Sequence, residues 1–432
     1  MKTTVKNTQV TEDIFNQVDQ LWDEEVEFLQ EIGRYPTTLG NEQALQNYLA
    51  KHFEEMELDV DQFVPDMKEL SSHPGFSVPE WGYDGRTVVV AKAPGADVKK
   101  GKSLIYQGHI DVVSPEPVSA WSYDPWGSTI KDGKMYGRGI QDMKSGVAAM
   151  IYAYKAVRAA GYRPAADFML QTVIEEECTG NGALAALEKG YTADGALIPE
   201  PFGYKATKSQ VGVMWMRVKV KGLGAHTERA SEAVNAIEKL YVMMDALKKY
   251  RTHINEEPKH PDFAEHPHPL NVNIGTIQGG DWPSNVPSEA TLEARVGFYP
   301  GQDPDEIKAN VKEWLLEAAK EDEWLRECPP EITFYGFHAE GFALDDQSEL
   351  FQVLDSAHET VLQTPPERSI LTATTDARFF NLYYDIPCTC YGPTGGNMHG
   401  IDEWVDLESV KNVTKVYADF LVNWCGVVKE EK

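Results

Sequence analysis

One interruption in a regular pattern constrains the fold of this chain more than any other feature. On both sides of it, short apolar runs alternate with helical stretches, as at residues 103–106, 145–160 and 168–174. Such alternation is typical of an α/β unit built on a mostly parallel sheet. Over residues 210–339 the order changes to strand, helix, strand, strand, helix, strand. That order is typical of a ferredoxin-like unit.

We therefore predict an α/β fold of two units, because 432 residues exceed what one hydrophobic core usually holds. The larger unit is predicted over residues 1–209 and 340–432 and contains the mostly parallel sheet. The smaller β-α-β-β-α-β unit, over residues 210–339, is inserted into it.

The charge of the chain excludes some classes of partner. There are 68 acidic and 40 basic side chains, which gives a formal net charge of -28. Such a surface repels nucleic acids and anionic membranes. Residues 1–5 carry no apolar leader, no apolar run is long enough to span a membrane, and the five cysteines follow no pattern. We expect a cytoplasmic protein with reduced thiols.

Histidines and carboxylates follow several of the predicted strands. His109 and Asp111 come after strand 103–106, and Glu200 comes after strand 196–198. The carboxyl ends of strands in such sheets are where ligands bind. Taken singly, each residue has an ordinary structural explanation, such as a solvent-facing turn or a helix cap. We expect further residues at the same edge. They are the three adjacent glutamates 175–177, Asp142 just before a helix, and His399 in a glycine-rich loop.

Together these residues form a mixed nitrogen and oxygen set that Zn²⁺ and similar ions accept. The five carboxylates concerned would repel one another strongly without cations. We therefore predict two divalent ions per chain, with Zn²⁺ the first choice and Co²⁺ or Mn²⁺ also suited. The carboxylates are Asp111, Asp142, Glu176, Glu177 and Glu200.

Five ordered fragments of the sequence resemble the aminoacylase family of dinuclear zinc hydrolases. Members of that family include acetylornithine deacetylase, succinyl-diaminopimelate desuccinylase and carboxypeptidase G. The resemblance implies a catalytic unit that holds both metals and an inserted lid unit through which the chain forms a homodimer. The fragments are residues 108–113, 136–144, 176–177, 199–201 and 398–399, with further similarity at 224–226 and 375–378.

The resemblance also implies which residues bind each metal ion. His109 and Glu200 would bind one ion, and Glu177 and His399 would bind the other. Asp142 would bridge the two ions, and its peptide bond to the next residue would be cis.

Three further residues receive catalytic roles from the resemblance. Glu176 would be the general base that later acts as the acid. Asp111 would orient His109. His226, in the inserted unit, would donate a hydrogen bond to the oxyanion in the active site of the partner subunit.

The residues that would bind the substrate follow the family pattern less closely. Arg378 matches an arginine that contacts the substrate in the family. The position of the family's carboxylate-binding arginine falls on Gly297, because the turn that begins at Asn285 is one residue shorter here. Either Arg295 takes the place of that arginine or the carboxylate clamp is absent. Asn285 and Arg295 are therefore further candidates for substrate binding.

The predicted activity is hydrolysis of the amide bond in a small N-acyl amino acid or N-acyl amine, as in acetylornithine deacetylase. A dipeptidase or carboxypeptidase is possible within the same chemistry. So is a deformylase that acts on an N-formyl-aminomethylpyrimidine from thiamin breakdown, which an absent carboxylate clamp favours. The alternative from another class is a non-catalytic dimer that binds metal or ligand. Glu176 counts against it, because a binding protein needs no base.

Overall fold

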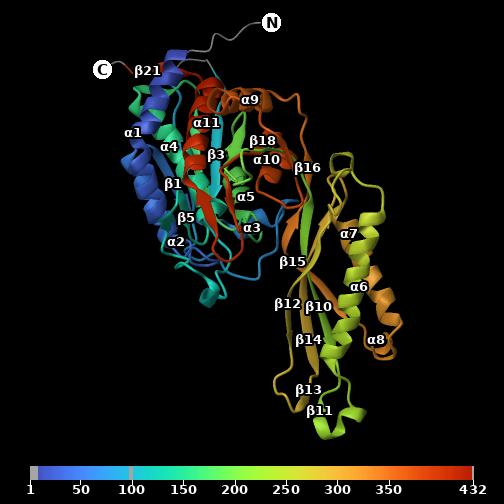
Figure 1. Cartoon of the computed structure of the whole chain (residues 1–432). Helices are drawn as coiled ribbons and strands as arrows, with labels where there is room; N and C mark the ends of the chain where they lie inside the picture. The colour runs from blue at the N-terminus through green and yellow to red at the C-terminus, as the bar shows by residue number, and fades with distance from the viewer. Residues whose placement is uncertain (1–7, 97–100, 431–432) are drawn as a thin grey trace.

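The computed structural model describes residues 8–96 and 101–430. Residues 1–5, on which the expectation about a leader depended, lie outside them. The chain forms a large α/β body, which carries both termini, and an elongated insert that projects from it (Figure 1). Body and insert have separate hydrophobic cores, and a small third cluster that includes Val211 and Phe337 lies between them.

The body is built on a six-stranded sheet. Its strands lie in the order β1 (Asp59–Phe63), β2 (Val88–Ala93), β7 (Phe168–Val173), β3 (Leu104–His109), β8 (Ala196–Ile198) and β18 (Cys388–Cys390). The strands from β7 to β18 pair in parallel, and β2 pairs antiparallel with both β1 and β7. All residues of β3, β7 and β8 are buried, as expected for strands covered on both faces. The prediction of a mostly parallel α/β sheet is confirmed.

Helices cover this sheet. The helix α4 (Ser145–Ala159) packs against both α1 (Thr8–Gly33) and α11 (Leu407–Cys425), and it also contacts β3. The remaining helices of the body are α2 (Gln43–Glu55), α3 (Met67–Leu70), α5 (Asn181–Glu188), α9 (Glu349–Leu362) and α10 (Ala377–Tyr383). Smaller sheets join β19 (Gly395–Gly396), β20 (Trp404–Asp406), β5 (Lys134–Tyr136) and β4 (Thr129–Lys131), and also β21 (Val427–Lys429) and β6 (Tyr162–Pro164).

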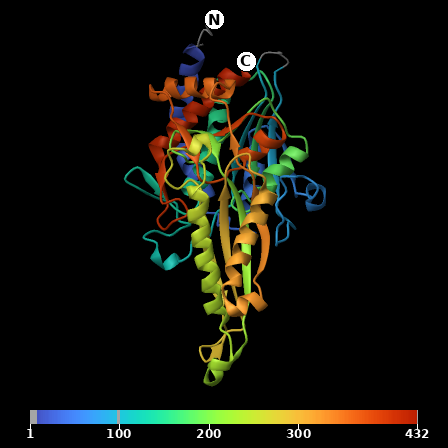
Figure 2. The ribbon, with the colours of Figure 1, turned by 90° about the vertical axis from the view of Figure 1, so that its right-hand side faces the viewer.

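The insert is a four-stranded antiparallel sheet with two long helices on it (Figure 2). Its elements follow the predicted order: β10 (Gly212–Lys221), α6 (Ala236–Glu256), β12 (Val272–Gly279), β14 (Glu289–Phe298), α7 (Pro304–Lys320) and β15 (Glu331–Ala339). Alternate residues of β10 are buried from Met214 to Val220, because that face packs against the helices. A short helix, α8 (Glu323–Glu327), follows α7.

The chain enters and leaves the insert at neighbouring points. It passes from β9 (Ala206–Gln210) into β10, and it returns from β15 into β16 (Phe342–Ala343), which pairs with β9. A third strand, β17 (Arg368–Leu371), completes this junction sheet. At the other end of the insert, farthest from the body in both views, β11 (Ala225–His226) pairs with β13 (Asn285–Val286). Among the described residues, no helix is long and apolar enough to cross a membrane.

Candidate metal centre and active site

Three neighbouring parallel strands bring the candidate residues to one edge of the central sheet. His109 is the last residue of β3, Glu176 lies just beyond β7, and Glu200 lies just beyond β8. Because β3 lies between β7 and β8, the three side chains converge. All three are buried.

Asp142 stands between two groups of candidate ligands. Its Oδ1 lies 3.1 Å from His109 Nε2, and its Oδ2 lies 3.2 Å from His399 Nε2. Glu200 Oε1 is 3.7 Å from His109 Nε2, and Glu177 Oε1 is 2.9 Å from His399 Nε2. Within each of these two groups the ligand atoms lie within 4.8 Å of one another, and so do those of His109, Glu176 and Glu177. The five residues are thus assembled in two groups that share Asp142, while their role as metal ligands stays a prediction.

A buried ion pair that the sequence analysis missed holds Asp142 in place. Glu403 Oε1 accepts hydrogen bonds from the backbone N–H groups of Gln141 and Asp142, at 3.0 and 3.2 Å. Glu403 also pairs with Arg138, whose Nη2 donates to the carbonyl of Gly400, next to His399, at 2.9 Å. The pair therefore joins the Asp142 turn to the loop of His399. The peptide bond from Asp142 to Met143 is cis, as the resemblance implied.

Asp111 contacts the site through both its main chain and its side chain. The Nδ1 of His109 lies 2.9 Å from the backbone carbonyl oxygen of Asp111 and 3.7 Å from its carboxylate. Nδ1 donating to this carbonyl leaves Nε2 free to face Asp142. The Asp111 carboxylate instead accepts the backbone N–H groups of Glu176 and Glu177, at 3.3 and 3.1 Å. Asp111 thus orients His109 through its main chain and the glutamate turn through its side chain.

The concentration of carboxylates shifts the pKa values of the site. Burial and the neighbouring Glu200 raise the pKa of Glu176 well above its usual range. Burial and Asp142 do the same for Glu200. Burial lowers the pKa of His399, but Glu177 and Asp142 outweigh it and raise that pKa to about 11. These shifts follow from the close packing of buried acids and histidines in one place.

The residues present fit a pair of divalent cations. Glu200 Oε1 is buried and has no hydrogen-bond partner in the described part of the chain. A buried carboxylate oxygen without a donor is costly unless a cation binds it. Imidazole nitrogens and carboxylate oxygens are together the donor set of catalytic zinc sites.

The two arginines predicted to bind substrate each donate to backbone carbonyls of the body. Arg378 is buried, and its Nη1 and Nη2 donate to the carbonyls of Thr375 and Thr179, at 3.0 and 2.8 Å. Arg295 Nη2 donates to the carbonyl of Thr372, at 3.0 Å, and so connects the insert to the body. Arg378 thus holds two loops together in this structure, and substrate contact by either arginine stays a prediction.

His226 and Asn285 lie at the far end of the insert. They face each other in the β11–β13 pair, and both are exposed. The Nδ1 of His226 accepts a hydrogen bond from the backbone N–H of Glu228, at 3.1 Å. The fold of one chain therefore does not bring these two residues to the cluster around Asp142 (Figure 1).

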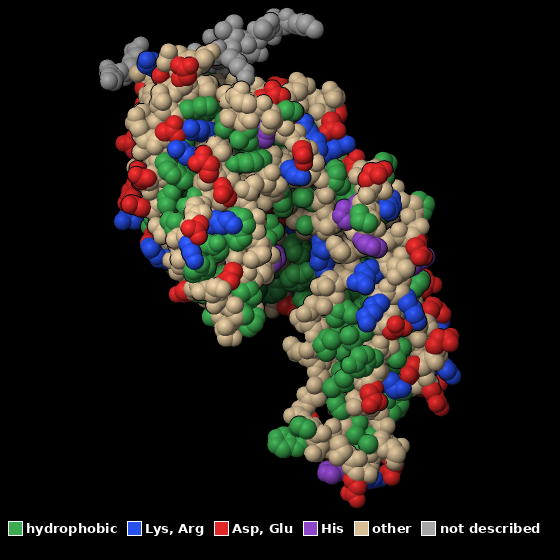
Figure 3. All heavy atoms as spheres, viewed as in Figure 1, with side chains coloured by type: hydrophobic (Ala, Val, Ile, Leu, Met, Phe, Trp, Pro, Cys, Tyr) green, Lys and Arg blue, Asp and Glu red, His purple; other side chains and the backbone are tan. Residues whose placement is uncertain are grey.

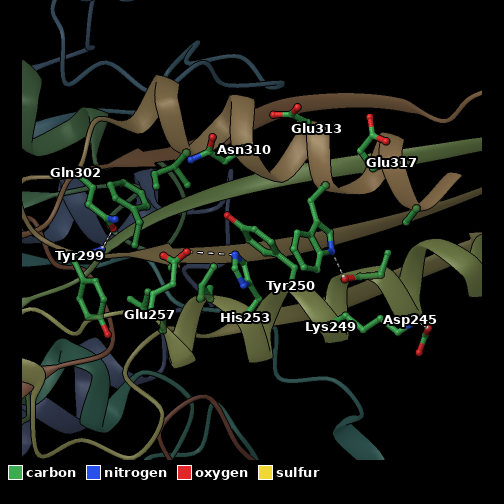
Figure 4. A pocket seen from close by; sticks show the side chains of 18 of the residues that line it. Asp245, Lys249, Tyr250, His253, Glu257, Tyr299, Gln302, Asn310, Glu313 and Glu317 are labelled. Carbon is green, nitrogen blue, oxygen red and sulfur yellow. Dashed lines mark hydrogen bonds and ion pairs between the residues drawn. The ribbon is translucent and has the colours of Figure 1, made fainter. Parts of the chain in front are cut away.

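The structure has one hollow between the body and the insert and another within the insert. The space-filling view shows the molecule hollowed between body and insert (Figure 3). A separate cavity of about 870 Å³ lies between α6 and α7, with Tyr250, His253 and Trp314 in its lining (Figure 4). Gly297 lines that cavity, whereas none of the residues grouped around Asp142 does, and the whole lining belongs to the insert.

Comparisons with known proteins show the family of the chain. Residues 105–423 match peptidase family M20/M25/M40. An N-formyl-4-amino-5-aminomethyl-2-methylpyrimidine deformylase of Bacillus subtilis (strain 168) is 30% identical over 383 residues, covering 83% of this chain and 88% of that one. A deformylase of the same name from Halalkalibacterium halodurans is 27% identical, covering 97% and 99%. Human carnosine dipeptidase 1 has the same fold, with a TM-score of 0.76 at 18% identity over 96% of this chain and 99% of that one. The chain therefore belongs to peptidase family M20/M25/M40 and is a metal-dependent hydrolase of amide bonds.

Proposed function

We propose that this hydrolase removes the formyl group from a small N-formyl amine of the aminomethylpyrimidine class. The two named deformylases resemble the chain over most of its length. The structural observation that carries the choice is Gly297, the position where the resemblance places a carboxylate-binding arginine. A side chain there would meet the backbone of Asn271 at 3.3 Å, and the N–H of Gly297 donates to that backbone at 2.8 Å. A substrate without a carboxylate suits such a site.

The chemistry assigns a part to each group of the site. When bound, two divalent ions would polarise the acyl carbonyl and lower the pKa of water. Glu176 would accept the proton of the attacking water and then deliver it to the departing amine. Asp111 would hold the backbone of Glu176 in position through its two accepted N–H bonds. The partner subunit's His226 would donate a hydrogen bond to the carbonyl oxygen as negative charge develops on it.

A second candidate activity is hydrolysis of an N-acyl amino acid or a dipeptide. Arg295 favours this activity. Its guanidinium lies largely inside the protein, and no carboxylate of the described chain forms an ion pair with it. Such an arginine suits the carboxylate of a substrate.

A substrate panel separates the two candidates. Amine release should be faster from the N-formyl aminomethylpyrimidine than from N-acetyl amino acids, N-succinyl amines or dipeptides. Arg295→Met should leave kcat/KM for the formamide within about two-fold, because a contact that is not made carries no binding energy. If a carboxylate-bearing substrate is cleaved fastest and Arg295→Met lowers its kcat/KM tenfold or more, the second candidate replaces the first.

Metal content tests the ligand assignment without any substrate. Protein equilibrated with Zn²⁺ and then desalted should hold about two ions per chain. His109→Ala and His399→Ala should each lower the content toward about one, because each removes one nitrogen ligand from one group. His253→Ala, in α6, is the matched control and should keep both ions. Wild-type protein that binds no Zn²⁺, Co²⁺ or Mn²⁺ would contradict the assignment.

We also propose that the chain forms a homodimer through the insert. Four large apolar side chains of the insert are exposed, and such side chains can be buried against another subunit. They are Leu223, Tyr241, Ile277 and Trp282. Two of them, Leu223 and Trp282, lie close in sequence to β11 and β13. The cytoplasm, where such thiols remain reduced, is the proposed location.

A further inference from the structure

Glu175, the first of the three adjacent glutamates, has no part in the metal groups described above. It is buried, and its φ of 69° is in the left-handed region. Its carboxylate accepts hydrogen bonds from Trp81 Nε1 and Thr179 Oγ1, each at 2.6 Å. Tyr83 and Arg86 also donate to it. Glu175 therefore binds the body of the protein on the opposite side of the turn from the candidate active site.

The backbone of Glu175 closes the turn that carries the candidate base. Its carbonyl accepts the N–H groups of Thr179 and Gly180, at 2.9 and 2.6 Å. On the other side, Asp111 accepts the N–H groups of Glu176 and Glu177. Hydrogen bonds thus fix the turn on both sides, and Glu175 makes those on one side.

Three of the four donors to the Glu175 carboxylate belong to one irregular stretch, residues 77–86, which we call the crossing segment. It is fixed to the body at both ends. Arg86 pairs with the buried Glu42, and Ser77 exchanges two hydrogen bonds with Asn181, at 3.2 and 2.8 Å.

The crossing segment also binds the insert. Arg217 of β10 donates through Nη1 and Nη2 to the two carboxylate oxygens of Glu80, at 2.9 and 2.8 Å. The backbone N–H of Gly336 in β15 donates to the carbonyl of Val78, at 3.0 Å. The pairing of β10 with β15 is irregular near this point. Trp215 pairs with Tyr335, whereas the preceding residue, Met214, pairs with His338. Such a bulge leaves N–H groups free for a partner outside the sheet.

Glu80, which binds the insert, is next in sequence to Trp81, which binds Glu175. Consecutive residues are only about 3.8 Å apart between Cα atoms. A change in the position of Arg217 therefore reaches Glu175 through a single peptide unit. We propose that Glu175 is a positioning residue for Glu176, and that the crossing segment couples the position of the insert to the turn that carries Glu176 and Glu177. The first half of this proposal rests on the proposed role of Glu176 as the base.

Two mild variants test the coupling. Trp81→Phe removes one N–H donor to Glu175 and keeps an aromatic ring, and Glu80→Gln removes the charge that pairs with Arg217. Each should lower kcat by up to about five-fold, the range expected for a partly exposed polar contact. KM and bound metal should not change, because Trp81 and Glu80 contact Glu175 and Arg217 and none of the predicted metal ligands. Glu289→Gln is the matched control, since it breaks a 2.8 Å pair with Lys219 elsewhere in the same sheet and should leave kcat unchanged.

Hydrogen exchange gives a measurement that does not depend on turnover. In both variants the backbone amides of Glu176 and Glu177 should exchange faster than in the wild type, while those of β12 should not. A double variant, Glu80→Ala with Arg217→Ala, should lower kcat no more than the stronger of its two single variants, because both act through one contact.

The outcomes separate this proposal from the proposed function. Unchanged kcat and unchanged exchange in both folded variants overturn the coupling, as does a loss of kcat that only follows lost metal. If the wild type cleaves no formamide, acyl amine or dipeptide, the proposed function fails, and the exchange measurement still decides the coupling.

Discussion

Glu176→Gln should lower kcat by about two to four orders of magnitude, the usual effect of removing a general base. Glutamine has nearly the same shape, but it cannot accept the proton of the attacking water. The hydrogen bond from position 176 to Asp111 uses the backbone N–H, so the substitution leaves the turn in place. The bound metal should stay at the wild-type level. Turnover at saturating substrate and metal analysis of the same samples measure the two quantities.

Two matched variants make the result specific. Glu54→Gln, on the exposed face of α2, should keep wild-type turnover and shows what a lost carboxylate does elsewhere. Glu177→Gln should lose metal before turnover, because Glu177 is a predicted metal ligand and is grouped with Asp142 and His399. Near-normal turnover in Glu176→Gln would assign proton transfer to another group, and metal loss in that variant would make Glu176 a ligand.

The sequence predicted the layers of the fold better than the order of its strands. The runs that became β3, β7 and β8 are apolar throughout because they are buried on both faces, and this property is readable from the sequence. The three residues of β18 are too few to show a period. The place of β18 beside β8 depends on contacts across nearly 200 residues, which no local pattern contains.

The candidate site was predictable in its residue types and less so in their directions. Parallel strand ends meet at one edge, so their histidine and acids could be expected to converge. Glu175 and Glu176 are chemically alike and adjacent, and only the backbone turn sends one into the body and the other to the metal groups. The pair of Arg138 and Glu403 was missed because its partners are far apart in sequence.

His226→Ala should lower kcat by about two to three orders of magnitude, the usual effect of losing one oxyanion donor. Metal content and substrate affinity should change little, because this contact forms mainly in the transition state. The placement of His226 adds a condition. β11 lies at the end of the insert farthest from the body, so a single chain does not bring His226 to its own metal groups (Figure 1). The proposed role of His226 therefore requires a second copy of the chain to supply it.

Complementation between two variants tests whether His226 of one subunit acts in the active site of the other. In a mixed dimer of His226→Ala and Glu176→Gln chains, the site of the first chain has an intact Glu176 and receives the partner subunit's His226 intact. The other site lacks both groups. One active site in each mixed dimer should then work, so a random mixture should recover about a quarter of wild-type activity per chain if the subunits exchange freely. Each variant mixed with itself is the control and should stay nearly inactive.

If mass spectrometry shows mixed dimers and no activity returns, His226 has no role in the partner's site. A monomeric protein with wild-type turnover would contradict the arrangement altogether, because the tip of the insert would then have no second body to reach.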